Sequence, residues 1–205
     1  AMNENNYRSV SPELYKFREC LLDTLALQCS FPGKPREIAI SEKGVSIPYH
    51  AALDSPIAKR FASLTARHLI IARSAPECTT YSHYVASGGS AYFLFTKKIE
   101  STDDHPQEDF GLSKGMMDAL GQEGWYFQPR SAAAAFATTT RHLAFTSAPA
   151  ELNLRKGFYC YGFQKAQGSV AALWTIDANP YPAILDLPTA AQISDLMGNS
   201  RTMPA

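Results

Sequence analysis

Two apolar strand-like runs on either side of an amphipathic helix constrain the fold of this chain more than any other feature. The runs cover residues 37–41 and 79–85, and their apolar, β-branched and aromatic content is typical of strands. Between them, Ser55 and Pro56 predict a helix start, with serine as the N-cap and proline at the first helical position. The apolar spacing that follows predicts a helix over residues 56–74.

A helix is also predicted ahead of the first run, because Ser11 and Pro12 repeat the same start signal. The order helix, strand, helix, strand is typical of a doubly wound sheet or a (β/α) barrel, in which the strands run parallel. A further helix is predicted over residues 131–145, where an alanine run leaves a small face for close packing. Between these elements the pattern is mixed, with a turn at residues 87–90 and a polar loop at residues 103–109.

The pattern of the chain changes after Pro149. Strand-like runs at residues 158–163, 169–175 and 181–187 follow one another at spacings of about 11 or 12 residues, separated by turn-forming residues. Such regular spacing indicates an antiparallel sheet, as in a β-sandwich. We therefore predict an α/β plus β architecture, with the α/β part at residues 1–148 and the β part at residues 149–205.

The charge balance limits the class of partner. Nineteen basic and nineteen acidic residues among 205 give a net charge of zero, so neither nucleic acid nor a polybasic membrane contact is expected. No run of 18 apolar residues is present, so no membrane span is expected. Residues 1–6 lack the apolar segment of a signal peptide, and the compartment stays undetermined, with a secreted or periplasmic parent protein as one alternative.

Motifs for metals and cofactors are missing from the sequence. The histidines have no metal-ligand spacing, so we expect no metal and no cofactor. The cysteines form no Cys-x-x-Cys pair and are expected as four buried thiols: Cys20, Cys29, Cys78 and Cys160.

Glu42 is the leading candidate for chemistry, because it directly follows the predicted strand at residues 37–41. In α/β folds the ligand site lies at the carboxyl ends of the strands, where a carboxylate can serve as a nucleophile or general base. The alternative is a loop carboxylate that pairs with Lys43 or Arg36.

Aromatic and histidine residues follow or end the same two strands. Tyr81, His83 and Tyr84 lie at the end of the second strand, and Tyr49 and His50 lie in the loop that follows the first. We predict that these five residues bind substrate at one mouth. The alternative for Tyr81 and His83 is a place in the wall or core, and for His50 a solvated loop.

Three segments, read in order, resemble the C-terminal part of retaining glycoside hydrolases built on a (β/α)8 barrel. Residues 36–44 are similar to the family's seventh strand, with Glu42 at the nucleophile position and Ser41 in place of the commoner threonine. Residues 66–74, followed by residues 80–84, are similar to the seventh helix and eighth strand, with His83 where family members often carry an aromatic residue, commonly tryptophan. The third similarity is to the last barrel helix and the accessory β-sandwich, and it covers residues 129–138, 169–175 and 195–199.

The resemblance implies the last βα units of a TIM-like barrel, followed by an antiparallel β-sandwich portion. It also implies double-displacement hydrolysis of an O-glycosyl bond, with Glu42 as the nucleophile and a carbohydrate as the ligand. The family's general acid is a glutamate at the end of the fourth strand. By strand count this chain begins near the sixth helix, and a complete barrel takes about 200–250 residues. The acid is therefore absent, and the chain is expected to hydrolyse nothing alone.

Two other functions stay open. One is a non-catalytic carbohydrate-binding or protein-interaction module, in which Trp125 and Trp174 stack on sugar rings. The other is a self-contained α/β protein with an unrelated binding site. Trp174 lies in an apolar run, however, and is expected in the core. A partial barrel also exposes unpaired strand edges, so we expect a missing N-terminal barrel segment or self-association to cover them.

Overall fold

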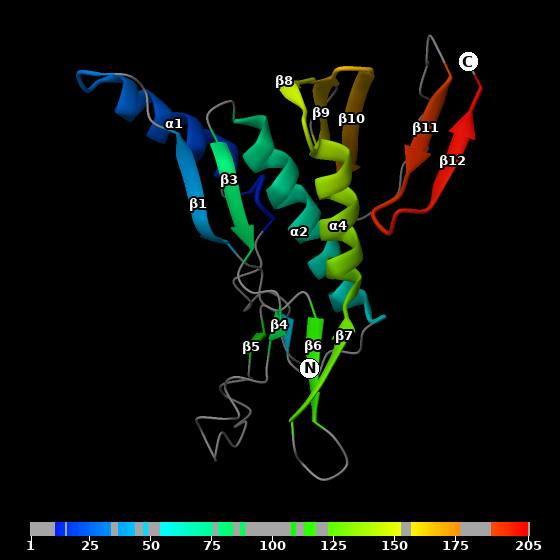
Figure 1. The fold of residues 1–205 in the computed structure, drawn as a ribbon. Coiled ribbons are helices and arrows are strands. Elements are labelled where there is room, and N and C mark those ends of the chain that lie inside the picture. Colours follow the sequence, from blue (N-terminus) through cyan, green and yellow to red (C-terminus); the bar gives the residue numbers. More distant parts are fainter. Residues whose placement is uncertain are drawn as a thin grey trace.

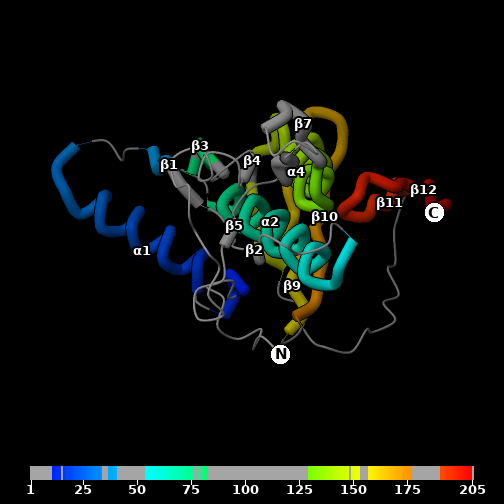
Figure 2. The backbone as a smooth tube through the Cα atoms, turned by 90° about the horizontal axis from the view of Figure 1, so that it is seen from below, coloured from blue at the N-terminus to red at the C-terminus, as the bar shows by residue number. Residues whose placement is uncertain are grey.

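The computed structural model describes residues 11–14, 16–33, 37–43, 47–48, 54–75, 78–83, 87–88, 108–109, 113–117, 123–152, 157–176 and 190–204. In Figures 1 and 2, helix α1 (Phe17–Cys29) and the hairpin of β11 (Ala191–Ser194) and β12 (Ser200–Met203) lie at opposite ends of the molecule. Within the described ranges, every helix is too short or too polar to cross a membrane.

Helix α2 (Pro56–Ser74) is the central element, and its predicted start and end are confirmed. The Ser55 hydroxyl accepts a hydrogen bond from the Ala58 amide at 3.2 Å, which caps the first turn. The helix packs against α4 (Ser131–Leu143), which lies within the helix predicted over residues 131–145 (Figure 1). Small side chains on both helices are buried at this contact and let the two backbones approach closely: Ala58, Ala62, Ala66, Ala132 and Ala135.

Helix α1 begins later than predicted, and the helix start at Ser11 is wrong. Residues 11–14 form a turn, and Lys16 takes a left-handed backbone conformation with φ 57° before the helix begins at Phe17. Ser11 gives the helix no cap, because its hydroxyl donates to the Glu13 carboxylate instead.

Strands β1 (Ile38–Lys43) and β3 (Cys78–His83) pair in parallel, with α2 between them in the chain. The predicted parallel arrangement of these two strands is therefore confirmed. β1 continues past residue 41, so Glu42 lies within the strand rather than after it.

The mixed middle region contains strands that the sequence pattern missed. Ser87–Gly88 is strand β4 rather than a turn, and it pairs with β6 (Ser113–Met117), which pairs in turn with β7 (Glu123–Pro129). Glu108–Asp109 is strand β5 rather than a loop, and it pairs with β2 (Ile47–Pro48). At residues 87–88 and 108–109 these predictions are wrong, because such short, polar strands are specified by their pairing partners and not by their own composition. Residues 89–90 and 103–107 lie outside the described residues.

The predicted antiparallel sheet is confirmed for two of its three runs. β9 (Phe158–Lys165) pairs with β10 (Gly168–Thr175) on one edge and with β8 (Ser147–Glu151) on the other. The run at residues 181–187 lies outside the described residues. Residues 195–199 join β11 to β12, and a Cβ added to Gly198 (φ 89°) would meet Thr138 Oγ1 of α4 at 3.0 Å. The tip of this hairpin therefore lies against α4.

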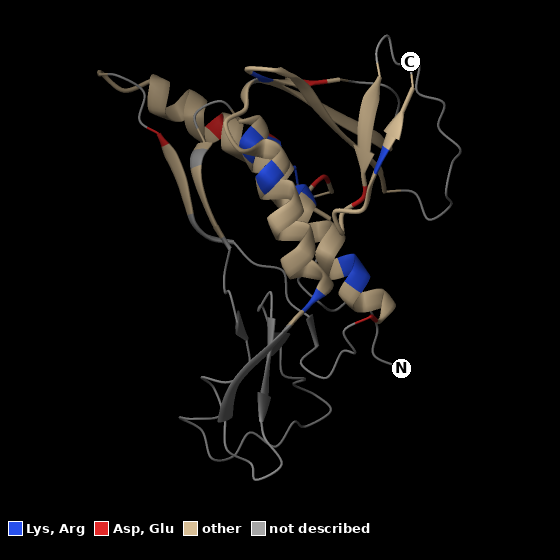
Figure 3. Cartoon of the chain, turned by 45° about the vertical axis from the view of Figure 1, so that its right-hand side comes forward, with Lys and Arg blue, Asp and Glu red and all other residues tan. Residues whose placement is uncertain are grey.

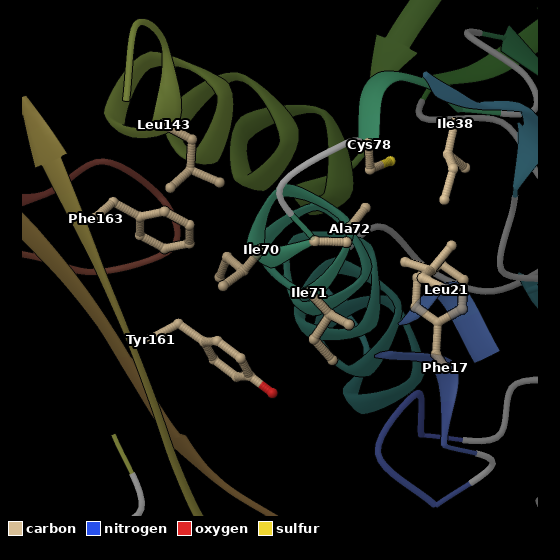
Figure 4. Close-up of a cluster of buried hydrophobic side chains, with 11 residues drawn as sticks. Phe17, Leu21, Ile38, Ile70, Ile71, Ala72, Cys78, Leu143, Tyr161 and Phe163 are labelled. Carbon is tan, nitrogen blue, oxygen red and sulfur yellow. The ribbon is translucent and has the colours of Figure 1, made fainter. Parts of the chain in front are cut away.

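One hydrophobic core connects residues from both sides of the predicted division at residue 148. Figure 4 shows Tyr161 and Phe163 of β9 on one side of α2, and Phe17 and Leu21 of α1 on the other. Ile71 of α2 lies between them and is 1% exposed. Helix α1 and the antiparallel sheet thus bury their apolar faces against the same helix, α2.

Candidate functional site

The predicted catalytic residue, Glu42, lies near the carboxyl end of β1, beside the carboxyl end of β3. Glu42 is the second-last residue of β1, and the next residue, Lys43, pairs with His83 at the end of β3. Because the strands are parallel, both of these ends lie at the same edge of the sheet. This is the edge at which α/β proteins carry their ligand sites.

The strand pairing is interrupted at Glu42. Ile40 pairs with Tyr81, and the next pair joins Lys43 to His83. Between these two pairs β1 therefore has one more residue than β3. An extra residue of this kind bends the strand, and such bulges are over-represented next to active sites. One irregularity therefore falls at Ser41 and Glu42, and another, in which β3 has the extra residue, falls between Ile38 and Ala39.

The other predicted binding residues are placed only in part. Tyr81 is half-buried and packs against the hydrophobic core, which is the alternative that its strand position left open. The backbone of His83 lies beside that of Lys43. Tyr49, His50 and Tyr84 lie outside the described residues.

A buried ion pair between Glu13 and Arg67 forms the centre of a polar cluster in the described part of the chain. Their side chains are 2% and 12% exposed. Arg67 Nε donates to Glu13 Oε1 at 2.8 Å, and Arg67 Nη2 binds Oε2. The Ser11 hydroxyl donates to Oε2 at 2.5 Å, and the Trp174 indole N–H donates to Oε1 at 2.6 Å. Each carboxylate oxygen therefore accepts two hydrogen bonds.

Trp174 also stacks on the tyrosines of the neighbouring strand. Its ring centroid lies 5.7 Å from that of Tyr159 and 5.4 Å from that of Tyr161, with interplanar angles of 14° and 15°. Trp174 is half-buried and packs against the core, as its apolar run predicts. Its indole N–H is bound by Glu13 and its ring contacts two tyrosines, so the ring is held in place within the fold. The side chain of Trp125 lies outside the described residues.

A second ion pair extends the cluster to α1 and β8. Arg18 pairs with Glu151 at 3.1 Å and donates to the Ser74 hydroxyl at 3.1 Å. Tyr161 donates to the same Glu151 carboxylate at 3.4 Å. The two pairs together connect the N-terminal turn and α1 with α2 and the antiparallel sheet.

The surroundings of Glu13 keep its carboxyl ionised. Burial raises the pKa of Glu13, but the hydrogen bonds from Arg67 and Ser11 and the charge of Arg67 outweigh this effect, so the net pKa lies below its ordinary value of 4.5. A general acid in a glycosidase needs the opposite shift, because it must hold its proton near neutral pH. Glu13 therefore joins parts of the fold and is not suited to act as a general acid.

The Glu13 pair predicts a loss of stability in acid. A carboxyl whose pKa is lowered by folding stabilises the native state above its unfolded pKa, and this contribution disappears as the pH falls through the folded pKa. We expect the difference in unfolding free energy between the wild-type chain and Glu13→Gln to be largest near pH 7 and to shrink as the pH falls below 4.5. Urea titrations at a series of pH values measure this difference, and a constant difference down to pH 2 would contradict the assignment.

Sequence reasoning did not find this cluster. Glu13 and Trp174 are 161 residues apart, and Glu13 and Arg67 are 54 apart. The residues follow no motif, and the local signal at Ser11–Glu13 is that of an ordinary helix start. An acidic residue beside a proline in an apolar stretch gave no indication of burial.

The cysteines are only partly as expected. Cys78 and Cys160 are buried free thiols, and burial raises the pKa of both, which makes them poor nucleophiles. Cys20 and Cys29 are exposed on α1, so the expectation of four buried thiols is wrong for these two. They lie on the outer side of a helix that buries only Phe17 and Leu21.

Within the described residues, no three His, Cys, Asp or Glu side chains are grouped closely enough to hold a metal ion. Comparison with protein-family models, with curated protein sequences and with solved structures found no match for this chain.

Proposed function

We propose that this chain is the C-terminal part of a retaining glycoside hydrolase, with Glu42 as the catalytic nucleophile. The observation that carries the proposal is the position of Glu42 at the irregular carboxyl end of β1, beside the end of the parallel strand β3. Helix α2 connects the two strands, and α4 packs on α2, as consecutive βα units of a barrel do. The antiparallel sheet then corresponds to the accessory sandwich.

The chemistry follows from a carboxylate at that edge. A Glu42 oxygen attacks the anomeric carbon and the glycosidic C–O bond breaks, while a second carboxylic acid gives its proton to the leaving oxygen. Water then attacks the same carbon and passes a proton to that second group, which releases the Glu42 carboxylate. Within the proposal, the second group comes from a part of the barrel that this chain lacks.

Unpaired strand edges support the same proposal. Among the described residues, β1 and β3 pair only with each other, so each has one edge without a strand partner. Parallel sheets of this kind are normally covered and extended on both sides. A further barrel segment, or a second copy of the chain, fits these edges.

A mechanism-based label tests the nucleophile without needing the acid. We expect 2-deoxy-2-fluoroglycosyl fluorides to trap a covalent glycosyl ester on Glu42, because fluoride leaves without being protonated. A panel of hexosyl and pentosyl fluorides is used, with intact-mass and peptide-mapping mass spectrometry as the readout. Glu42→Gln should abolish the label, and the control Glu37→Gln, at the exposed start of the same region, should keep it.

Two outcomes contradict the proposal. The first is the absence of any label on Glu42 across the whole panel. The second is turnover of an unactivated alkyl glycoside by the isolated chain that Glu42→Ala abolishes, since this would mean that the chain already contains its acid.

A further inference from the structure

The turn that joins α4 to β8 holds a phenylalanine in an unfavourable backbone conformation. Thr146 N donates to Leu143 O at 3.2 Å and closes a four-residue turn. Ala144 has φ −58° and ψ 134°, and Phe145 has φ 58°. These angles describe a type II turn, whose third position requires positive φ and therefore favours glycine or asparagine. A phenylalanine at this position costs stability.

The fold gains nothing from this side chain, because Phe145 is 100% exposed. Its neighbours in the turn are firmly placed. Leu143 and Thr146 are buried, the Thr146 hydroxyl donates to Leu143 O at 2.7 Å, and Arg73 of α2 donates to Thr146 O. The aromatic ring therefore projects from a rigid base into solvent, which is the usual property of a binding anchor.

The charges at this end of α4 are positive. Arg141 is exposed, and Lys165, at the end of β9, donates to Arg141 O at 3.5 Å. Burial lowers the pKa of His142, and the two charges that add to this effect are those of Arg141 and Lys165. Neither α2 nor α4 contains an acidic residue, as the absence of red on both helices in Figure 3 shows.

We propose that Phe145, Arg141 and Lys165 form a binding site for an acidic polysaccharide, separate from Glu42. The apolar face of a sugar ring stacks on Phe145, and carboxylates of the polymer pair with the two cations. The choice of a carbohydrate over other anionic partners rests on the proposed function. Nucleic acid is disfavoured by the zero net charge of the chain.

Affinity electrophoresis and calorimetry with polygalacturonate test the site. Phe145→Gly is the informative variant, because glycine suits a φ of 58° and the fold should be kept. We expect this variant to weaken binding roughly tenfold, the order of one aromatic contact. Arg141→Gln with Lys165→Gln should weaken binding and remove most of its salt dependence. Lys59→Gln, which removes an exposed cation near the opposite end of α2, should bind as the wild-type chain does.

The comparison ligands decide between this proposal and its alternatives. Neutral galactan should bind more weakly than polygalacturonate, and polyglutamate should show no dependence on Phe145. Binding of polygalacturonate that Phe145→Gly leaves unchanged overturns the proposal, as does equal, Phe145-dependent binding of polyglutamate or of vesicles containing anionic lipid. Because Glu42 takes no part in this site, failure of the label on Glu42 and failure of this binding are separate results.

Discussion

Replacing Glu13 with alanine is expected to lower the free energy of unfolding by about 3–5 kcal/mol, the usual cost of removing one partner of a buried ion pair. The change leaves the Arg67 guanidinium largely buried without its carboxylate, since its side chain is only 12% exposed. It also leaves the Trp174 indole N–H without the acceptor that it has at 2.6 Å.

Urea denaturation followed by circular dichroism measures this loss. Glu19→Ala is the matched control, because Glu19 is exposed in the first turn of α1 and should change stability by no more than about 0.5 kcal/mol. The double variant Glu13→Ala with Arg67→Ala should lose less than the sum of the single variants, because neither charge is then left alone. Additive losses would show that the two side chains do not act as a pair.

Replacing Phe163 with alanine is expected to cost about 3–5 kcal/mol, the range for removing a buried aromatic side chain from a core. Phe163 is 1% exposed and belongs to the cluster that β9 shares with α1, α2 and β1. Because the cluster is shared, the loss should lower the stability of the helices as well as that of the sheet.

The number of unfolding transitions checks this second expectation. We expect a single transition at the same urea concentration by tryptophan fluorescence and by helical circular dichroism, both in the wild-type chain and in Phe163→Ala. Leu173→Ala on β10 is the control, because Leu173 is 39% exposed and contributes less to the core. A helical signal whose midpoint is the same in both chains would mean that the sheet unfolds separately.

The elements that the sequence predicts well are those specified by their own residues. The serine–proline start and apolar stripe of α2 require no distant partner. The turn residues between β9 and β10 strongly favour a hairpin. Helix α4 is predicted for the same reason. Its last residues, 144 and 145, leave the helix for the turn that leads into β8.

The features that sequence reasoning missed depend on distant contacts. The start signal at Ser11 is locally sound, yet Glu13 is bound by Arg67 and Trp174, and the helix begins only after Lys16 turns left-handed. The position of Glu42 at a strand end could be predicted from the apolar run before it. The extra residue of β1 at this point, relative to β3, could not be predicted, because register is a property of the pair of strands.

The contact between Glu13 and Trp174 also has a consequence for synthesis on the ribosome. The two residues are 161 positions apart, which corresponds to roughly 8–32 s of translation at about 5–20 residues per second. During this interval Arg67 can already neutralise Glu13, but the indole that completes the carboxylate's hydrogen bonds has not been made. The turn at residues 11–14 therefore reaches its final place only when β10, the last described strand of the antiparallel sheet, emerges.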